Sequence, residues 1–231
     1  EPKYPYLKFF NSLGESIAIP YGIRQSFKDS VAQLGYLKDW NYYPMEEIYL
    51  TDNSSKIIDY RINIGLKYKL AKGLNLSAVY QFNKGRHEHK YYRGEETHFT
   101  RDLVNTFTEV NGQEIIKHVP DKGGISDQLL ESYKAHNVRL QLNYTHSWKS
   151  RNTATHRIAT LSGIEVRDIN TKTDGPRIYG ITPGSPEGRA VDTNITYALY
   201  YSPLLSQKIP SNSVNRTRVD RYISYYFTGA Y

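Results

Sequence analysis

Residues 58 to 70 alternate between apolar and polar or small side chains at every position. The apolar set is Ile58, Tyr60, Ile62, Ile64, Leu66, Tyr68 and Leu70. After a short turn at 71–73 the alternation resumes, with Leu74, Leu76, Ala78, Tyr80 and Phe82 on one face and Val79 as the exception. Because successive side chains of a strand point to opposite faces, the pattern predicts a β-hairpin with one apolar and one polar face.

The same period of two returns further along the chain. Together the segments predict an all-β, antiparallel fold with strands near 56–70, 74–84, 136–148, 153–167 and 217–231. Thr160 and Ser162 interrupt the apolar face of the fourth strand, which suggests a β-bulge. Strands of soluble domains usually have about 5 to 6 residues, whereas a tilted strand needs about 9 to 11 to cross a bilayer. These strands are long enough to span a membrane.

The connections between the predicted strands differ in length in a regular way. The turns at 71–73 and 149–152 are short, whereas the other connections are far longer than ordinary loops. Outer-membrane barrels combine short periplasmic turns with long extracellular loops. We therefore predict a segment of one transmembrane β-barrel domain covering 1–231, with extracellular loops near 1–52, 85–135 and 168–216, of which 1–52 is mostly irregular.

Local signals predict some order within the long connections. Asn111 and Gly112 form the strongest short turn signal and predict a small hairpin over 106–119. Residues 126–134 have the pattern of a short helical turn. The proline-bearing segments at 175–177 and 182–186 predict ordered turns.

Composition excludes several classes of protein. The mean hydropathy is −0.64 and no run of 18 uncharged apolar residues occurs, so helical membrane spans are not expected. The 22 tyrosines suit strands and membrane interfaces, where the ring is buried and the hydroxyl stays wet. The absence of cysteine excludes disulfides and thiolate metal sites. Since an exported protein needs a signal peptide and none is visible, we expect a piece of a longer polypeptide.

The positive charge does not indicate a nucleic-acid partner. The net charge is +7 and the pI is near 9.3, but lysine and arginine are scattered along every segment. Neither a basic stripe nor a helix-turn-helix pattern is present, so we expect no nucleic acid to bind.

Several stretches occur in an order and spacing that resemble a known family. They are YGIRQSF (21–27), LKDWNYYPMEE (37–47), RDLVNTFT (101–108), PDKGGI (120–125), the pair 137–144 and 156–166, and DRYISYY (220–226). The set is similar to the barrel of the SusC/RagA family of TonB-linked (TonB-dependent) outer-membrane receptors. The resemblance extends over essentially the whole chain.

The resemblance implies a fold, a location and partners. It implies a middle section of a 22-stranded barrel in the cell outer membrane, with the N-terminal plug domain and the TonB box outside this fragment. The transporter would import large nutrients, oligosaccharides or peptides, under a SusD-like lipoprotein lid. Energy would come from the TonB-ExbB-ExbD complex through the plug. The assembly implied is a dimer of transporter and lipoprotein pairs.

Aromatic side chains in the long connections are the candidate substrate-binding residues. They are Trp40, Tyr42, Tyr43, Tyr91, Tyr92, Tyr200 and Tyr201. Aromatic rings bind the apolar faces of sugars or grip peptides, and the competing role is packing against the lid. A second set is expected to face membrane lipid or form aromatic girdles near strand ends. That set is Tyr60, Ile62, Ile64, Leu66, Tyr68, Tyr80, Phe82, Tyr144 and Trp148.

The sequence gives only weak signals of a catalytic or metal-binding site. His87 and His89 would share one face of a strand with His98 nearby, but spacing fixes no third ligand. The carboxylates Glu46, Glu47, Glu95, Glu96 and Asp192 are available for acid/base work, yet nothing in the sequence brings a pair together. No nucleophile elbow, P-loop or dinucleotide fingerprint occurs. We therefore predict no enzyme, no catalytic residues, no metal and no cofactor.

Three alternatives remain open from the residues alone. A soluble extracellular carbohydrate-binding β-sandwich would also be rich in tyrosine and alternation. An outer-membrane enzyme would carry a catalytic dyad in its loops. Within the transporter class, a TonB-dependent iron-siderophore receptor would share the same barrel.

Overall fold

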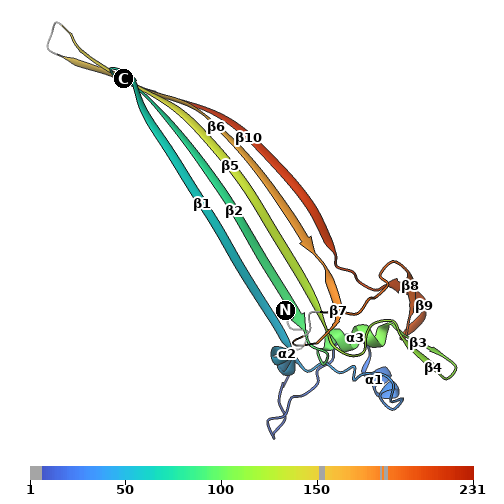
Figure 1. The fold of residues 1–231 in the computed structure, drawn as a ribbon. Helices are drawn as coiled ribbons and strands as arrows, with labels where there is room; N and C mark the ends of the chain where they lie inside the picture. The colour runs from blue at the N-terminus through green and yellow to red at the C-terminus, as the bar shows by residue number, and fades with distance from the viewer. Residues whose placement is uncertain (1–6, 151–153, 183, 185–186) are drawn as a thin grey trace. The chain divides into compact units, whose positions relative to one another are not determined.

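The computed structural model describes residues 7–150, 154–182, 184 and 187–231, and strands dominate the fold. Among the described residues, strands account for 62% and helices for 11%, so the fold is all-β and mostly antiparallel, as the alternation predicted. The main sheet contains, in spatial order, β1 (Thr51–Ala71), β2 (Leu74–Arg93), β5 (Gly124–Lys149), β6 (Thr155–Gly175) and β10 (Val214–Ala230), shown in Figure 1. A short strand, β7 (Arg177–Ile181), also pairs with β5. Within the described residues β1 and β10 are the edges of this sheet, and it does not close.

The smaller elements lie in the long connections. Two small hairpins are formed by β3 (Thr108–Asn111) with β4 (Glu114–Lys117), and by β8 (Thr196–Leu199) with β9 (Ser202–Lys208). The β3–β4 hairpin lies at the predicted place, and Gly112 takes the positive φ of 65° that its turn requires. The helices are α1 (Gln25–Ala32), α2 (Pro44–Leu50) and α3 (His98–Thr106). Among the described residues, no helix has both the length and the apolar character needed to cross a membrane.

The chain divides into two compact units. The strand unit comprises Lys56–Glu88, Leu130–Asp174 and Asn215–Tyr231, and the loop unit comprises Glu1–Ser55, His89–Leu129 and Gly175–Val214. Each unit has its own organisation.

Pairing in the strand unit is regular. Strands β5 and β6 pair without a shift of register from Leu130↔Asp174 to Lys149↔Thr155. The bulge expected at Thr160 and Ser162 is therefore absent, because their hydroxyls occupy ordinary pleat positions opposite Tyr144 and Leu142. Continuous pairing places even-numbered residues of both strands on one face and odd-numbered residues on the other.

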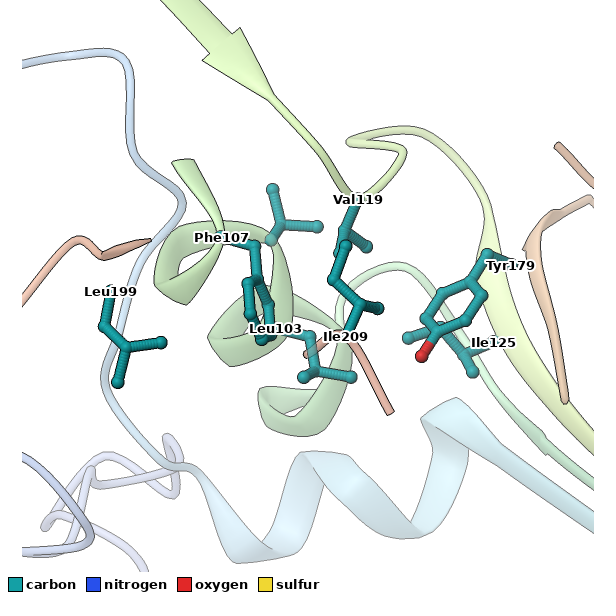
Figure 2. Close-up of a cluster of buried hydrophobic side chains, with 8 residues drawn as sticks. Leu103, Phe107, Val119, Ile125, Tyr179, Leu199 and Ile209 are labelled. Atoms are coloured by element: carbon teal, nitrogen blue, oxygen red, sulfur yellow. The ribbon is translucent and has the colours of Figure 1, made fainter. Parts of the chain in front are cut away.

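The loop unit contains the buried core (Figure 2). Helix α3 contributes Leu103 and Val104, and its C-cap position contributes Phe107. The surrounding segments contribute Val119, Ile125, Tyr179, Leu199 and Ile209. Thr97 is the N-cap of the helix, and its hydroxyl oxygen accepts a hydrogen bond from the backbone N–H of Thr100. The backbone N–H of His98 donates to the carboxylate of Glu47 at 2.6 Å, which satisfies another free donor of the first turn.

Several predicted boundaries were wrong. The main strands extend into the loops predicted at 85–135 and 168–216, because β2 ends at Arg93, β5 begins at Gly124 and β6 ends at Gly175. The loop predicted at 1–52 contains α1 and α2, and the other two contain α3 and the short strands. Residues 126–134 are strand, not a helical turn, since Ser126 and Asp127 pair with Ile178 and Arg177 of β7. Strand β6 begins at Thr155, and the expected starting residue, Thr153, lies outside the described residues, as do parts of the turns predicted at 149–152 and 182–186.

Candidate functional site

One face of the strand unit is apolar and exposed. On β1, Ile62, Ile64 and Leu66 have 54%, 62% and 66% of their surface exposed, although aliphatic side chains normally lie inside a fold. The same face continues across the sheet with exposed Val138, Leu140, Tyr144, Trp148, Val166, Val219, Ile223, Tyr225 and Phe227. Soluble proteins commonly expose single apolar side chains, but they rarely expose a continuous apolar surface that extends across several strands.

Aromatic rings gather in two layers on the apolar face. In one layer the hydroxyl of Tyr80 lies 2.8 Å from Nδ1 of His136, and Phe82 packs against the same imidazole. In the other layer, Trp148 stacks between His146 and His156. Because β1 begins at Thr51, Tyr60 lies in the middle of its strand, and the expectation that it marks a strand end was wrong.

The opposite face of the strand unit is polar. Arg139 of β5 donates to Glu165 of β6 at 2.7 Å, and Asn137 donates to the same carboxylate at 2.9 Å. A hollow of about 270 Å³ on this face is lined only by polar and charged residues. They are Glu131, Thr171, Thr173, Arg216, Arg218 and Asp220.

On the polar face, two tyrosine rings each lie across a glycine of the neighbouring strand. The Tyr133 ring of β5 lies over Gly85 of β2, and its hydroxyl donates to Asp59 of β1 at 3.0 Å. The Tyr226 ring of β10 lies over Gly163 of β6, and its hydroxyl donates to Gln141 of β5 at 3.2 Å. Since a Cβ atom at either glycine would overlap the ring, each glycine permits a link across three strands.

Replacing Gly163 by alanine tests this arrangement. The new Cβ would overlap the Tyr226 ring and lie 2.7 Å from the Leu140 carbonyl oxygen, so we expect a loss of about 1–3 kcal/mol from the free energy of unfolding. Denaturant titration of the folded protein in detergent measures this loss. Gly65→Ala on β1 is the matched control, because its Cβ would meet no atom within 4 Å. Equal stability of the two variants would contradict the assignment.

In the loop unit, most of the predicted binding aromatics pack against other residues. Trp40 is only 3% exposed, and its indole N–H donates to Asp102 at 2.7 Å. Burial, followed by the hydrogen bond with Tyr36, raises the pKa of Tyr200 to about 12, so this phenol stays neutral. Tyr201 also packs near the Trp40 ring, although it is 40% exposed. Trp40 therefore packs inside the loop unit and exposes almost no surface.

The other predicted aromatics have varied environments. Tyr42 contacts the rings of Tyr21 and His98. The guanidinium carbon of Arg93 lies over the Tyr91 ring, 4.1 Å from the ring centroid. The Tyr92 ring packs on Gly124. The remaining residue of the set is Tyr43, and it lines an open hollow.

The hollow around Tyr43 is acidic. It has a volume of about 440 Å³ and is lined by Asp39, Tyr43, Glu46, Tyr49, Leu50, Glu96 and Arg101. Arg101 is buried and donates to the backbone carbonyls of Glu96 and Asp39, so its charge is engaged in holding the two segments together. Glu46 and Glu96, which the sequence could not bring together, share this hollow with the exposed ring of Tyr49.

The other predicted carboxylates and histidines have structural contacts or lie apart. Glu95 accepts hydrogen bonds from Lys38 and from the backbone N–H of Gly123. His98 is buried, and this burial lowers its pKa, so the neutral ring packs against Tyr21 and Tyr42. In the part of the chain that the structure describes, no three histidine or carboxylate side chains gather in a way that would hold a metal ion.

No family model matches this chain, and no curated protein matches it. Its function therefore has to be inferred from its own residues and their geometry.

A partly buried charge cluster in the loop unit connects three segments. Asp127 accepts hydrogen bonds from Arg177 at 2.6 and 2.8 Å and from Arg93 at 2.8 Å. Both guanidinium groups lie over the ring of Phe99, 4.2 and 5.3 Å from its centroid. Burial would raise the pKa of Asp127, but the hydrogen bonds from Arg177 and Arg93 outweigh it and hold the pKa at about 2.

This charge cluster predicts a pH dependence of stability. Because the folded pKa of Asp127 is below its ordinary value of 3.8, its stabilisation is complete above about pH 4 and is lost as the pH falls through about 2. We expect the difference in unfolding free energy between wild type and Asp127→Asn to shrink by about 2 kcal/mol from pH 5 to pH 2. Denaturant titrations of both proteins across this range measure the difference, and a constant difference would contradict the assignment.

Sequence reasoning missed three parts of the site. Tyr49 and Asp39 were not among the predicted binding residues, although Tyr49 follows a Pro-Met-Glu-Glu run that begins a helix. The Asp127 cluster joins residues far apart in the chain, which no local signal reveals. The glycines beneath Tyr133 and Tyr226 are visible in the sequence as single glycines within strand patterns, a sign of close approach by another group.

Proposed function

We propose that this chain is part of the barrel wall of a TonB-dependent outer-membrane transporter of the SusC/RagA type. It would import oligosaccharides or peptides, and a SusD-like lipoprotein would cover its loops. The observation that carries the proposal is the exposed apolar face of the strand unit, backed by a polar face on the same strands.

The dimensions of the apolar face support contact with lipid. On β1, Tyr60 and Tyr68 flank Ile62, Ile64 and Leu66, and the apolar row continues one position further at each end, to Ile58 and Leu70. At about 3.4 Å per residue the two tyrosines are about 27 Å apart along the strand, or about 20 Å in height at a tilt of roughly 40°. The apolar band of an outer-membrane barrel is about 25 Å tall and is flanked by aromatic girdles. Tyr80 and Trp148 belong to the two aromatic layers that fit such girdles.

The two edges of the main sheet support membership of a larger barrel. Strands β1 and β10 each present an unpaired row of backbone donors and acceptors, within the described residues. In hydrocarbon each unpaired group costs several kcal/mol, so only a closed barrel is stable there. We propose that further strands pair with both edges and that the polar face lines the barrel interior.

The acidic hollow is the candidate contact site for the nutrient. The carboxylates of Glu46 and Glu96 would accept hydrogen bonds from sugar hydroxyls or from peptide N–H and amino groups, whereas that of Asp39 already pairs with Arg101 at 3.4 Å. The rings of Tyr43 and Tyr49 provide apolar surface of the kind that stacks on a sugar face. A hollow of about 440 Å³ is within the size range of small-ligand sites.

Fractionation of cells that produce the protein containing this chain tests the proposal. We expect the protein in the outer membrane, released only by detergent, with faster migration on gels before heating than after. Recovery in buffer without detergent would overturn the proposal and favour the soluble β-sandwich. Uptake of labelled oligosaccharide, peptide and iron-siderophore, with and without TonB, then identifies the class of cargo.

A further inference from the structure

A cluster of basic side chains lies on the apolar face of the strand unit, in a cavity of about 550 Å³. We call it the basic patch, and it consists of Lys84, Arg86, Lys134 and Lys172. Ser132 and Asn170 line the same cavity and add neutral hydrogen-bonding groups. Ile58 and Tyr60 of β1 form its apolar side.

Charge in the cavity is unbalanced. Its lining contains the four cations of the basic patch and no carboxylate. Arg86 pairs with Glu88 at 2.5 Å and Lys172 pairs with Asp174 at 3.1 Å, but all four of these side chains are at least one-third exposed, so water screens these pairs. Among the described residues, Lys84 and Lys134 have no salt-bridge partner. An anion is therefore the complementary ligand.

Register fixes the position of the basic patch relative to the apolar band. Along the even-numbered face of β5 and β6, the apolar pair Val138↔Val166 is followed by His136↔Asp168 and then by Lys134↔Asn170 and Ser132↔Lys172. His136 belongs to the aromatic layer with Tyr80. The order along the face is thus an aliphatic layer, a layer of aromatic rings that also contains the Asp168–Arg221 ion pair, and then the basic patch. A membrane presents hydrocarbon, interface and head groups in the same order.

We propose that the basic patch binds the phosphate groups of an anionic membrane lipid. The inference rests on the proposed function, because it requires the apolar face to contact lipid. Acyl chains of the bound lipid lie along Tyr60, Val138 and Val166, while its phosphate oxygens accept charge-assisted hydrogen bonds from the lysines and Arg86. The patch lies toward the ends of the strands that lead into the long connections, so the lipid belongs to the outer leaflet.

Binding of lipid A to the purified full-length protein in non-ionic detergent tests this assignment. The probes are bis-phosphorylated lipid A, phosphatidylcholine and inorganic phosphate, measured by native mass spectrometry and thermophoresis. We expect the triple variant K84Q/K134Q/K172Q to bind lipid A about 100-fold more weakly than wild type at low salt, since each lysine near a charged membrane surface contributes about a factor of five or more. Inorganic phosphate alone should bind far more weakly than lipid A.

The matched control is the triple variant K67Q/K69Q/R167Q, which removes the same charge from the polar face. It should bind lipid A as wild type does. Equal binding by the two triple variants would overturn the lipid site, and inorganic phosphate binding as tightly as lipid A would identify a free-anion site instead. If the first triple variant fails to fold, Lys134→Gln alone should weaken binding about five-fold, and no change would overturn the assignment.

Membrane insertion separates this inference from the proposed function. Heat-dependent gel mobility is measured on wild type and on both triple variants. A wild type that does not insert contradicts the proposed function, whereas a wild type that inserts and binds lipid A no better than K84Q/K134Q/K172Q contradicts only the lipid site.

Discussion

Replacing Ile64 by arginine is expected to lower the free energy of unfolding in lipid vesicles by about 2–4 kcal/mol. Ile64 is 62% exposed and lies midway between Tyr60 and Tyr68 on the apolar face of β1. In the proposed barrel, a guanidinium at that depth would replace an aliphatic side chain in hydrocarbon, where a charge is costly. Reversible urea unfolding of the protein folded into vesicles measures the change.

The adjacent residue provides the matched control for Ile64→Arg. Asn63 occupies the next position of β1, and its side chain points to the polar face, so Asn63→Arg introduces the same group into a hydrated environment. We expect Asn63→Arg to change the unfolding free energy by less than about 0.5 kcal/mol. If the two variants are equally stable, the apolar face does not contact lipid and the proposed barrel is wrong.

Replacing Trp40 by alanine is expected to destabilise the loop unit by about 3–5 kcal/mol. Trp40 is buried among Phe27, Tyr200 and Tyr201, with ring centroids 6.0 to 6.4 Å from its own, and truncation would leave a cavity there. It would also leave the Asp102 carboxylate without its indole donor. Limited proteolysis and hydrogen exchange of the loop unit should both reveal the loss.

Trp40→Phe distinguishes packing from the loss of the hydrogen bond. The phenyl ring retains most of the buried apolar area, so we expect this variant to lose only about 1–3 kcal/mol, chiefly from the unpaired carboxylate of Asp102. A measurement of nutrient binding could contradict the packing role of Trp40. If Trp40→Ala abolishes binding while proteolysis and exchange remain at wild-type rates, the side chain contacts substrate as the sequence first indicated.

Strands were predictable where polarity differs between the two faces. In 58–70 every second residue is apolar, and in 138–148 the same series is apolar except for His146; the structure has strands in both places. Alternation does not extend into the run Arg86-His87-Glu88-His89, which is nevertheless part of β2, because charged residues occupy both faces. The start of β5 was missed for a different reason. Its partner β7 is fifty positions away in the chain, so no local pattern shows which hydrogen bonds hold it.

The candidate site was less predictable than the strands. Aromatic composition pointed to seven residues, but composition does not separate a buried ring such as Trp40 from one that lines a hollow such as Tyr43. That difference arises from tertiary packing around α3, a helix the sequence analysis did not predict. Its signals were present, with Thr97 as an N-cap and Leu103, Val104 and Phe107 at helical spacing.

The unbroken ladder between β5 and β6 also bears on how the hairpin assembles. The two strands are neighbours in sequence, so pairing can start near Lys149 and Thr155 and extend toward Leu130 and Asp174. Each further pair then costs little loop-closure entropy. A slip by one residue would turn every side chain of one strand to the wrong side and place Arg139 level with aliphatic neighbours. A misaligned hairpin would therefore be less stable along its whole length, and only one alignment yields two chemically uniform surfaces.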